Sequence, residues 1–204
     1  MVHFVGAGSG AVDLITVRGA RLLGACDVVI YAGSLVNPEL LQYCKEGCQI
    51  HDSAKMTLEE VIAVIRAAEA AGKTTVRLHT GDSSIYGAVH EQFVELDKLG
   101  IPYDVCPGVS AFCGAAASLR AEYTLPEVSQ TVIITRAAGR TPVPQGQSIR
   151  SLAAHRATMV LFLSTSLTRQ LQADLVVGDC LGDNVIRSLL YHPGFTTEFR
   201  EASL

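Results

Sequence analysis

Apolar residues along the chain follow two alternating patterns. Short runs of β-branched and apolar residues are typical of strands, and longer stretches with apolar residues every three or four positions are typical of helices. The first pattern repeatedly gives way to the second, which predicts an α/β fold. In the first half of the chain, strand-like runs cover 2–5, 27–31, 75–78 and 103–106, and helical stretches cover 13–23, 38–44, 57–71, 85–99 and 112–119.

The change of pattern is sharpest in the segment 76–87, VRLHTGDSSIYG. A strand enters a loop of small residues there, and helical spacing runs from Ile85 to Leu99. Open α/β proteins bind ligands at such junctions, because the backbone amides beyond the carboxyl ends of parallel strands are free of the sheet ladder. We therefore expect a ligand site in the loop Thr80–Ile85.

Two further loops, Gly6–Gly10 and Pro107–Ala111, also follow strand-like runs and are rich in small residues. None of the three loops contains lysine, and the P-loop pattern G-x-x-x-x-G-K-[ST] is absent from the sequence. This pattern favours a ligand held by backbone amides and carbonyls, such as an adenosyl group without phosphates.

The first loop allows a second interpretation. Gly6, Gly8 and Ala11 fit the permissive form of the dinucleotide pattern, G-x-G-x-x-A, which would indicate an NAD-linked oxidoreductase. That pattern also requires an acidic residue after the second strand, whereas 27–31 is followed by Ala-Gly-Ser at 32–34. The NAD interpretation is therefore disfavoured, and glycines that only form a tight turn remain an alternative.

The regular alternation pauses at 120–129 and then restarts. Two α/β domains are predicted from this pause, 1–120 and 130–204, joined by a linker at 121–129, rather than a single Rossmann sheet. In the second half, strand-like runs cover 131–135, 158–163, 185–191 and 198–204, and helical stretches cover 148–155 and 166–176.

Capping residues place several helix ends. Asp13 is expected to cap the first helix, with Gly24 as its stop. Thr57 and Glu60 have the spacing of a capping box, so the next long helix should begin between them. The preceding stretch, 50–55, is expected to be irregular.

Composition and charge narrow the class of protein. Hydrophobic residues make up 49% of the 204 residues, which is ample for a core. A net charge of -4 argues against a nucleic-acid partner, because binding to a phosphate backbone requires a basic face. The most apolar runs are shorter than the roughly 20 residues that cross a bilayer, and the start of the chain resembles a strand rather than a signal peptide. We expect no membrane partner.

The cysteines indicate a compartment. Six are scattered through apolar segments, which suits reduced, buried thiols in a cytoplasmic protein. Cys44, Cys48 and His51 could together be three metal ligands, but no CxxC pair accompanies them, and zinc sites usually contain one. Buried thiols are the favoured interpretation, and no metal site is expected.

Four polar residues are candidates for ligand binding. Asp82 could bind ligand hydroxyls or cations, or it could cap a helix that starts near Ile85. His79 could hydrogen-bond a ligand, or its ring could be satisfied by the backbone. Arg136 and Arg140 lie on a proline-flanked loop and suit carboxylates of an anionic substrate, although a solvated loop explains them equally well. No G-x-S-x-G elbow is present, and no catalytic base or nucleophile is assigned.

Several longer segments resemble the tetrapyrrole methylase family, whose members use S-adenosylmethionine to methylate corrin and sirohaem precursors. The similarity runs through nearly the whole chain. It implies methyl transfer to carbon 11 of a polycarboxylated tetrapyrrole in cobalamin biosynthesis, with methyl transfer to another position of the tetrapyrrole as the alternative. The similar segments are YAGSLVNPELL, RLHTGDSSIYGA, PGVSAF, LPEVSQTVI, TRAAGRTPVP and SLAAH, of which TRAAGRTPVP and LPEVSQT discriminate best within the family.

The resemblance also implies an architecture and a set of contacts. It implies a two-domain α/β fold with S-adenosylmethionine in the interdomain cleft, commonly as a homodimer. Beside the resemblance, Arg136 and Arg140 are the candidate contacts for substrate carboxylates, and His79 is a candidate contact for either the cofactor or the substrate. The implied cofactor contacts are Ser9, Thr80, Gly81, Asp82, Ile85, Ser110, Ala111, Leu163 and Pro193.

The sequence departs from the family pattern in two loops. The first loop of the family usually reads GxGPGD, whereas this chain has Ser9 in place of the proline and Ala11 in place of the acid. Ser83 replaces the proline of the usual GDPS. Both changes keep the backbone donors. A non-catalytic ligand-binding relative is the alternative that these changes leave open.

Overall fold

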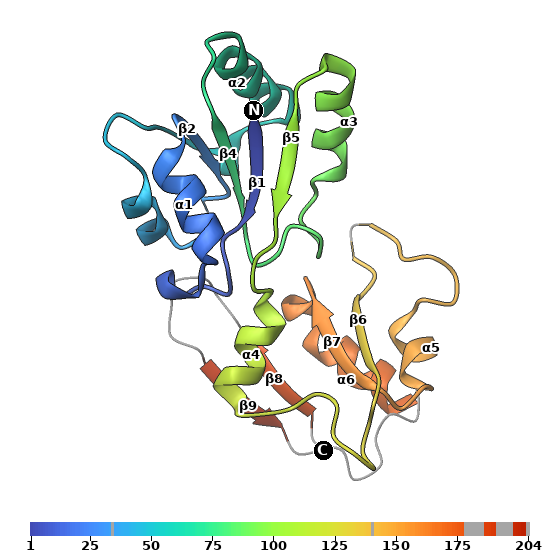
Figure 1. The fold of residues 1–204 in the computed structure, drawn as a ribbon. Coiled ribbons are helices and arrows are strands. Elements are labelled where there is room, and N and C mark those ends of the chain that lie inside the picture. Colours follow the sequence, from blue (N-terminus) through green and yellow to red (C-terminus); the bar gives the residue numbers. More distant parts are fainter. Residues whose placement is uncertain (34, 140, 178–185, 191–197, 203–204) are drawn as a thin grey trace. The chain divides into compact units, whose positions relative to one another are not determined.

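A computed structural model describes residues 1–33, 35–139, 141–177, 186–190 and 198–202 (Figure 1). The chain divides into two compact units, of which the first contains Met1–Ala115 and the second begins at Ala116. The α/β fold expected from the sequence is confirmed. The linker expected at 121–129 and the cofactor cleft between the domains stay predictions.

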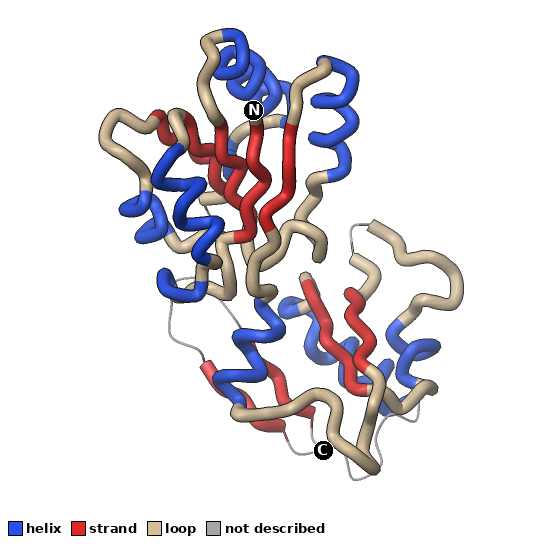
Figure 2. The backbone as a smooth tube through the Cα atoms, viewed as in Figure 1, coloured by secondary structure: helices blue, strands red, loops and turns tan. Residues whose placement is uncertain are grey.

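The first unit is built on a parallel sheet of five strands in the order β3-β2-β4-β1-β5. In Figure 2 its strands run side by side, flanked by helices. Because all four strand pairs are parallel, the carboxyl ends of all five strands lie at one edge. The strands are β1 (Val2–Gly6), β2 (Val28–Tyr31), β3 (Gln49–Asp52), β4 (Thr75–His79) and β5 (Tyr103–Cys106).

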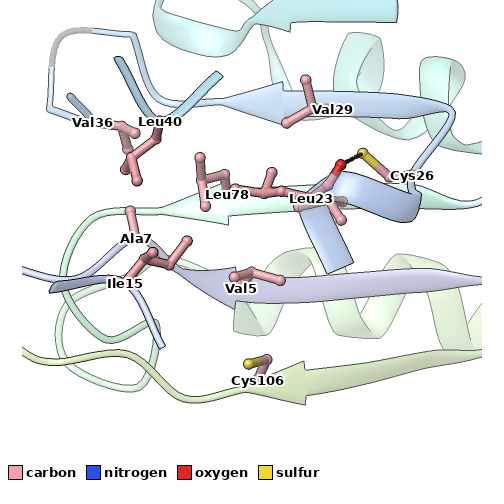
Figure 3. Close-up of a cluster of buried hydrophobic side chains, with 11 residues drawn as sticks. Val5, Ala7, Ile15, Leu23, Cys26, Val29, Val36, Leu40, Leu78 and Cys106 are labelled. Carbon is pink, nitrogen blue, oxygen red and sulfur yellow. Dashed lines mark hydrogen bonds between the residues drawn. The ribbon is translucent and has the colours of Figure 1, made fainter. Parts of the chain in front are cut away.

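Helices cover both faces of this sheet, so its inner strands β1, β2 and β4 are buried along almost their whole length. On one face, Val5 and Leu78 pack with Leu23 of α1 (Figure 3). On the other face, Phe4 and Ile30 pack with side chains of α2 and α3. The helices of this unit are α1 (Val17–Ala25), α2 (Leu58–Ala70) and α3 (His90–Leu99), with α4 (Ala111–Leu119) running into the second unit and 3-10 turns at Val12–Leu14, Pro38–Tyr43 and Ser53–Lys55.

The second unit contains a parallel pair of strands and an antiparallel pair. Its core cluster joins Ala137 to residues of α5 and α6, including Ile149 and Leu171. The parallel pair is β6 (Val132–Arg136) and β7 (Thr158–Phe162), the antiparallel pair is β8 (Ile186–Leu190) and β9 (Glu198–Ala202), and the helices are α5 (Ile149–Ala153), α6 (Thr168–Val177) and a 3-10 turn at Thr165–Leu167.

Two predicted helix starts are wrong. The side chain of Thr16, not Asp13, caps α1, because its Oγ1 accepts the Gly19 N–H at 3.0 Å, and Gly24 lies inside that helix. The helix expected from Ile85 begins only at His90. Tyr86 and Ala88 have positive φ values of 55° and 49°, which a right-handed helix cannot accommodate.

Two other local predictions had opposite outcomes. The capping box is confirmed, because the Thr57 N–H donates to Glu60 at 2.8 Å and the Glu60 N–H donates to Thr57 at 3.3 Å. The stretch expected to be irregular forms strand β3 at Gln49–Asp52 instead. Its backbone finds a partner in β2, which the local sequence does not show.

Among the described residues, no helix is both long and apolar enough to cross a membrane.

Candidate functional site

The three small-residue loops converge at the carboxyl edge of the first unit's sheet. They follow β4, β1 and β5, which are neighbours in the sheet. Gly8 and Gly81 exchange two backbone hydrogen bonds, of 3.2 and 3.1 Å. The Ala7 N–H also donates to the His79 carbonyl at 2.7 Å. The three loops singled out in the sequence therefore meet at one edge of the sheet.

Glycine is required where these loops meet. A Cβ atom on Gly6 would lie 2.6 Å from the Cα of Gly108. A Cβ atom on Gly108 would overlap with the Gly81 carbonyl oxygen and would lie 2.7 Å from the Cα of Gly6. Both contacts are with backbone, which cannot move aside as a flexible side chain can. The close approach of three chain segments thus depends on residues without side chains.

Asp82 joins the second loop to the third. Its Oδ2 accepts the Gly108 N–H at 2.8 Å, and its Oδ1 accepts the Ser84 N–H at 2.9 Å and the Ser84 hydroxyl. Burial raises the pKa of this carboxyl, but the hydrogen bonds from Ser84 and Gly108 outweigh burial and hold the pKa below its ordinary value. The interpretation of Asp82 as the cap of a helix near Ile85 is wrong, since α3 begins later.

His79 lies buried at the end of β4, with an exposed fraction of 5%. Burial and the charge of Arg77 lower the pKa of its imidazole to about 3, although a hydrogen bond with the Gly87 backbone raises it in part. The ring is therefore neutral at physiological pH. Within the described part of the chain, its Nε2 atom has no hydrogen-bond partner. The backbone thus provides a hydrogen-bond partner for one side of the ring, and the buried Nε2 atom has none among the described residues.

The buried side chain of Arg77, two residues before His79 in β4, carries a positive charge. Its Nε donates to Gln92 at 3.1 Å, and a terminal nitrogen donates to the Ile30 carbonyl at 3.1 Å. Burial lowers the pKa of the guanidinium to about 10, so it stays charged near neutral pH. These bonds tie β4 to β2 and α3.

The buried imidazole predicts a pH dependence of stability. The ordinary histidine pKa is 6.5 and the folded value is about 3, so between these values the unfolded chain binds more protons than the folded chain. Stability should therefore fall as the pH decreases below about 6.5, by up to about 1.4 kcal/mol per pH unit. Amide hydrogen exchange of β4 between about pH 7 and about pH 5 measures this loss. His79→Phe should flatten the dependence.

Exposed His155 provides the control for that prediction. His155→Phe should leave the acid dependence of β4 exchange as it is in the wild type. An equally steep loss of protection in His79→Phe would contradict the role given to His79.

The remaining cofactor candidates of the first unit lie in the converging loops. Ser9 and Ser110 are buried, with exposed fractions of 2% and 7%. Ser9 also faces α4, because a Cβ atom on Gly114 would lie 2.6 Å from the Ser9 Cβ. The structure therefore brings together most of the predicted cofactor residues, namely Ser9, Thr80, Gly81, Asp82, Ser110 and Ala111, with Ile85 following in the second loop.

The candidates of the second unit are placed differently. Leu163 follows β7 with an exposed fraction of 72% and a positive φ of 54°, which is rare for a branched residue and typical of functional sites. Arg136 donates three hydrogen bonds to carbonyls of its own loop, those of Ala137, Thr141 and Pro142, at 3.2, 3.0 and 2.9 Å. Arg140 and Pro193 lie outside the described residues.

The sequence did not indicate two residues whose side chains hold loops in place, one in each unit. The Asn37 side chain donates to the Gly10 carbonyl at 3.0 Å and so anchors the first loop. In the second unit, the Ser164 hydroxyl accepts the Ala137 N–H at 2.9 Å and donates to the Phe162 carbonyl at 2.7 Å. An Asn-Pro helix start and a serine after a strand were the available signals, but neither indicates its distant partner.

Fold and loops define an α/β protein of the kind that binds its ligand at the carboxyl ends of parallel strands. The chain belongs to the family of Tetrapyrrole (Corrin/Porphyrin) Methylases, whose family model matches residues 1–189. The family that the sequence resembled is thus confirmed.

Two curated relatives show the similarity in detail. The cobalt-precorrin-4 C(11)-methyltransferase of Methanocaldococcus jannaschii is 49% identical over 197 residues, which cover 97% of this chain and 76% of the relative. The precorrin-4 C(11)-methyltransferase of Mycobacterium tuberculosis (strain H37Rv) is 50% identical over 166 residues, which cover 81% of this chain and 66% of the relative. The chain thus spans only part of the length of each.

Solved structures give the same result. The X-ray structure of a cobalamin biosynthetic enzyme, cobalt precorrin-4 methyltransferase, matches with a TM-score of 0.94 at 39% identity and covers 99% of this chain and 84% of that one. The uroporphyrin-III C-methyltransferase of Thermus thermophilus, complexed with S-adenosylhomocysteine, matches with a TM-score of 0.78 at 21% identity over 98% of this chain and 82% of that one. The second likeness shows the fold alone.

Proposed function

We propose that this chain is an S-adenosylmethionine-dependent methyltransferase acting on carbon 11 of precorrin-4 or cobalt-precorrin-4 in cobalamin biosynthesis. The observation that carries the proposal is 49% identity over 97% of the chain to a cobalt-precorrin-4 C(11)-methyltransferase. The converging glycine loops support it independently, because they supply a binding edge at the expected place.

The residues of these loops fit the proposed cofactor. S-adenosylmethionine has no phosphates, and its binding needs no lysine or P-loop. The three loops offer backbone groups, three buried serines and one carboxylate, and contain no lysine or arginine. When bound, the cofactor supplies an electrophilic methyl group on a sulfonium sulfur. We assign its binding to Ser9, Thr80, Gly81, Asp82, Ile85, Ser110 and Ala111, together with Leu163 and Pro193.

The role of these residues is to position the cofactor rather than to form covalent bonds with the substrate. An electron-rich ring carbon is itself the nucleophile, so the protein's contribution is alignment of two reactants. Asp82 contributes by fixing the second loop to the third through Gly108 and by holding its own loop through Ser84. We assign no catalytic base.

For the substrate we propose His79, Arg136 and Arg140 as contacts. A tetrapyrrole with many carboxylates requires cations or donors, and arginine binds carboxylates through paired N–H groups. Arg136 already donates to three carbonyls of its loop, so its main effect is to shape the segment that carries Arg140.

Arg140→Ala is expected to weaken tetrapyrrole binding by about tenfold, the usual scale for one charge-assisted hydrogen-bonded contact of about 1.5 kcal/mol. Binding of S-adenosylhomocysteine should change little. Fluorescence titration with the tetrapyrrole and calorimetry with S-adenosylhomocysteine measure the two affinities. Arg150→Ala, on α5, is the control, and equal losses of both affinities in Arg140→Ala would contradict the substrate role.

A methyl-transfer assay tests the function itself. The chain, with its cysteines reduced, is incubated with S-adenosylmethionine that carries a labelled methyl group and with either precorrin-4 or cobalt-precorrin-4. The product should carry one additional methyl group, and the label should be found at carbon 11. Binding of S-adenosylhomocysteine without transfer would instead identify a non-catalytic ligand-binding relative. A titration with NADH separates the oxidoreductase alternative, and we expect no binding.

We further propose a homodimer in the cytoplasm. The resemblance to the family implies the dimer, and free cysteines at all described positions are compatible with a reducing compartment. Light scattering coupled to gel filtration measures the oligomeric state.

A further inference from the structure

Three cysteines meet at the edge of the first unit's sheet that lies opposite the glycine loops. Cys26 follows α1 and precedes β2, Cys44 follows the 3-10 helix Pro38–Tyr43, and Cys48 precedes β3. Their three Sγ atoms all lie within 4.8 Å of one another, and those of Cys26 and Cys48 are 3.7 Å apart. Figure 3 shows Cys26 beside Leu23 at the end of α1.

These three cysteines differ from the three metal ligands suggested by the sequence, which were Cys44, Cys48 and His51. His51, the third ligand in that hypothesis, lines a hollow with Gln49 and with Val64 and Ala67 of α2, on the other face of the sheet. Cys26 takes its place, although it lies 18 residues before Cys44. A local motif could not reveal this, because Cys26 lies in a different connection of the chain from Cys44 and Cys48.

The burial of the three thiols suits a site with one open side. Cys26 is fully buried in the core cluster of α1 and the sheet, whereas Cys44 and Cys48 are half-buried. An ion can therefore reach the cluster from the side of Cys44 and Cys48, where water can also complete its coordination. Lys45 is adjacent in sequence, and its ammonium donates to the Ala25 carbonyl at 3.1 Å and to Asp27 at 2.7 Å. A cation thus lies near a group of sulfurs.

We propose that Cys26, Cys44 and Cys48 bind one thiophilic metal ion of the zinc type as thiolates. Zinc–sulfur bonds of about 2.3 Å in tetrahedral geometry place the sulfurs about 3.8 Å apart. The distance between Cys26 and Cys48 matches that value, and the other pairs need only small movements. A disulfide, in contrast, requires the two sulfurs to approach to about 2.05 Å.

Binding exchanges protons for metal. One divalent ion replaces three thiol protons, which pass to the solvent, and the resulting centre of three thiolates and one ion has a net charge of -1. The Lys45 ammonium offsets part of that charge. Burial and the neighbouring thiols raise the pKa of Cys44 to about 11, so this thiol keeps its proton near neutral pH in the metal-free cluster.

The position of the cluster indicates a structural role. The converging loops lie at the carboxyl edge of the sheet, and the cysteines precede β2 and β3 at the amino edge. An ion there would fix α1 and the edge strand β3 to each other. It should raise the stability of the first unit and leave the affinity for S-adenosylhomocysteine unchanged.

Zinc titration of the full chain tests the proposal, after reduction and removal of metal with a chelator. We expect one zinc ion per chain, an increase in the thermal unfolding midpoint, and protection of these three cysteines from alkylation, mapped by mass spectrometry. Cys44→Ser and Cys48→Ser should each lower zinc affinity by at least about tenfold. Loss of a residue that only supports a metal ligand already costs about that much, and these variants remove a ligand itself. Cys113→Ser, outside the cluster, should bind as the wild type does.

Three outcomes of the zinc titration and the alkylation mapping would overturn the proposal. The first is a wild-type zinc affinity no higher than that of the Cys44→Ser, Cys48→Ser double variant. The second is an equal loss of zinc affinity in Cys113→Ser, and the third is alkylation of the three cysteines that bound zinc does not diminish. Alkylation mapping uses the wild-type chain, so it decides the matter even if a variant does not fold. A reduced chain that binds no zinc and forms a Cys26–Cys48 disulfide on oxidation would also contradict metal binding.

Discussion

Replacing Gly108 with alanine is expected to give one of the two largest losses of ligand binding in the chain. The new Cβ atom would overlap with the Gly81 carbonyl oxygen and with Gly6, so two loops would have to separate. Overpacking typically costs up to about 3 kcal/mol. If the loops must be closed for the ligand to bind, this cost corresponds to a loss of about a hundredfold in affinity. Calorimetry with S-adenosylhomocysteine measures the loss.

Gly24→Ala is the matched control for this substitution. Gly24 lies inside α1, and its added Cβ atom would meet the Tyr43 carbonyl oxygen at an ordinary 3.5 Å. Alanine there should stabilise the helix by about 0.5–1 kcal/mol and leave S-adenosylhomocysteine binding as in the wild type. Affinity in Gly108→Ala within a factor of about two of the wild type would show that the close loop contact is not required for binding.

The fold was predictable where the information is local. The strands β1, β4 and β5 coincide with short strand-like runs of the sequence, and the Thr57–Glu60 capping box involves residues three positions apart. Strand β3 was missed because Gln49, Ile50, His51 and Asp52 become a strand only through pairing with β2, more than a dozen residues away. Propensity is weak at such an edge, and tertiary pairing decides the outcome.

The late start of α3 has the same kind of cause. The apolar spacing from Ile85 onward is helical, but Gly87 packs so closely on Ser83 that a Cβ atom would overlap with the Ser83 carbonyl oxygen. The neighbouring Tyr86 and Ala88 adopt left-handed backbone conformations. This compact turn replaces one helical turn, and the sequence shows it only through a single glycine.

The site divides in a similar way. Glycine-rich loops after strands mark the binding edge from the sequence alone, because glycine reports close backbone approach. The bonds that hold the loops join distant residues, such as Asp82 to Gly108 and Asn37 to Gly10. Sequence patterns therefore predicted which loops form the candidate site, whereas the hydrogen bonds that hold these loops and the cysteine cluster required the folded structure.

Asp82→Ala is the second substitution with a large expected effect. It removes the acceptor of the part-buried Gly108 N–H and of the exposed Ser84 N–H, and leaving the Gly108 donor without a partner costs up to about 1–3 kcal/mol. We expect S-adenosylhomocysteine affinity to fall by about tenfold to a hundredfold, because the second and third loops lose their connection. The low pKa of Asp82 means that its contribution is present above the ordinary value of 3.8 and is lost as the pH falls further.

Calorimetry near neutral pH therefore measures the full contribution of the Asp82 carboxylate. Asp97→Ala removes an exposed acid of α3 in the same unit and should bind S-adenosylhomocysteine as the wild type does. Unchanged affinity in Asp82→Ala would contradict the role of this carboxylate while leaving the methyltransferase proposal intact. Absence of binding in the wild-type chain would instead remove the proposed function, because a cofactor-dependent methyltransferase must bind the product of its cofactor as well as the cofactor itself.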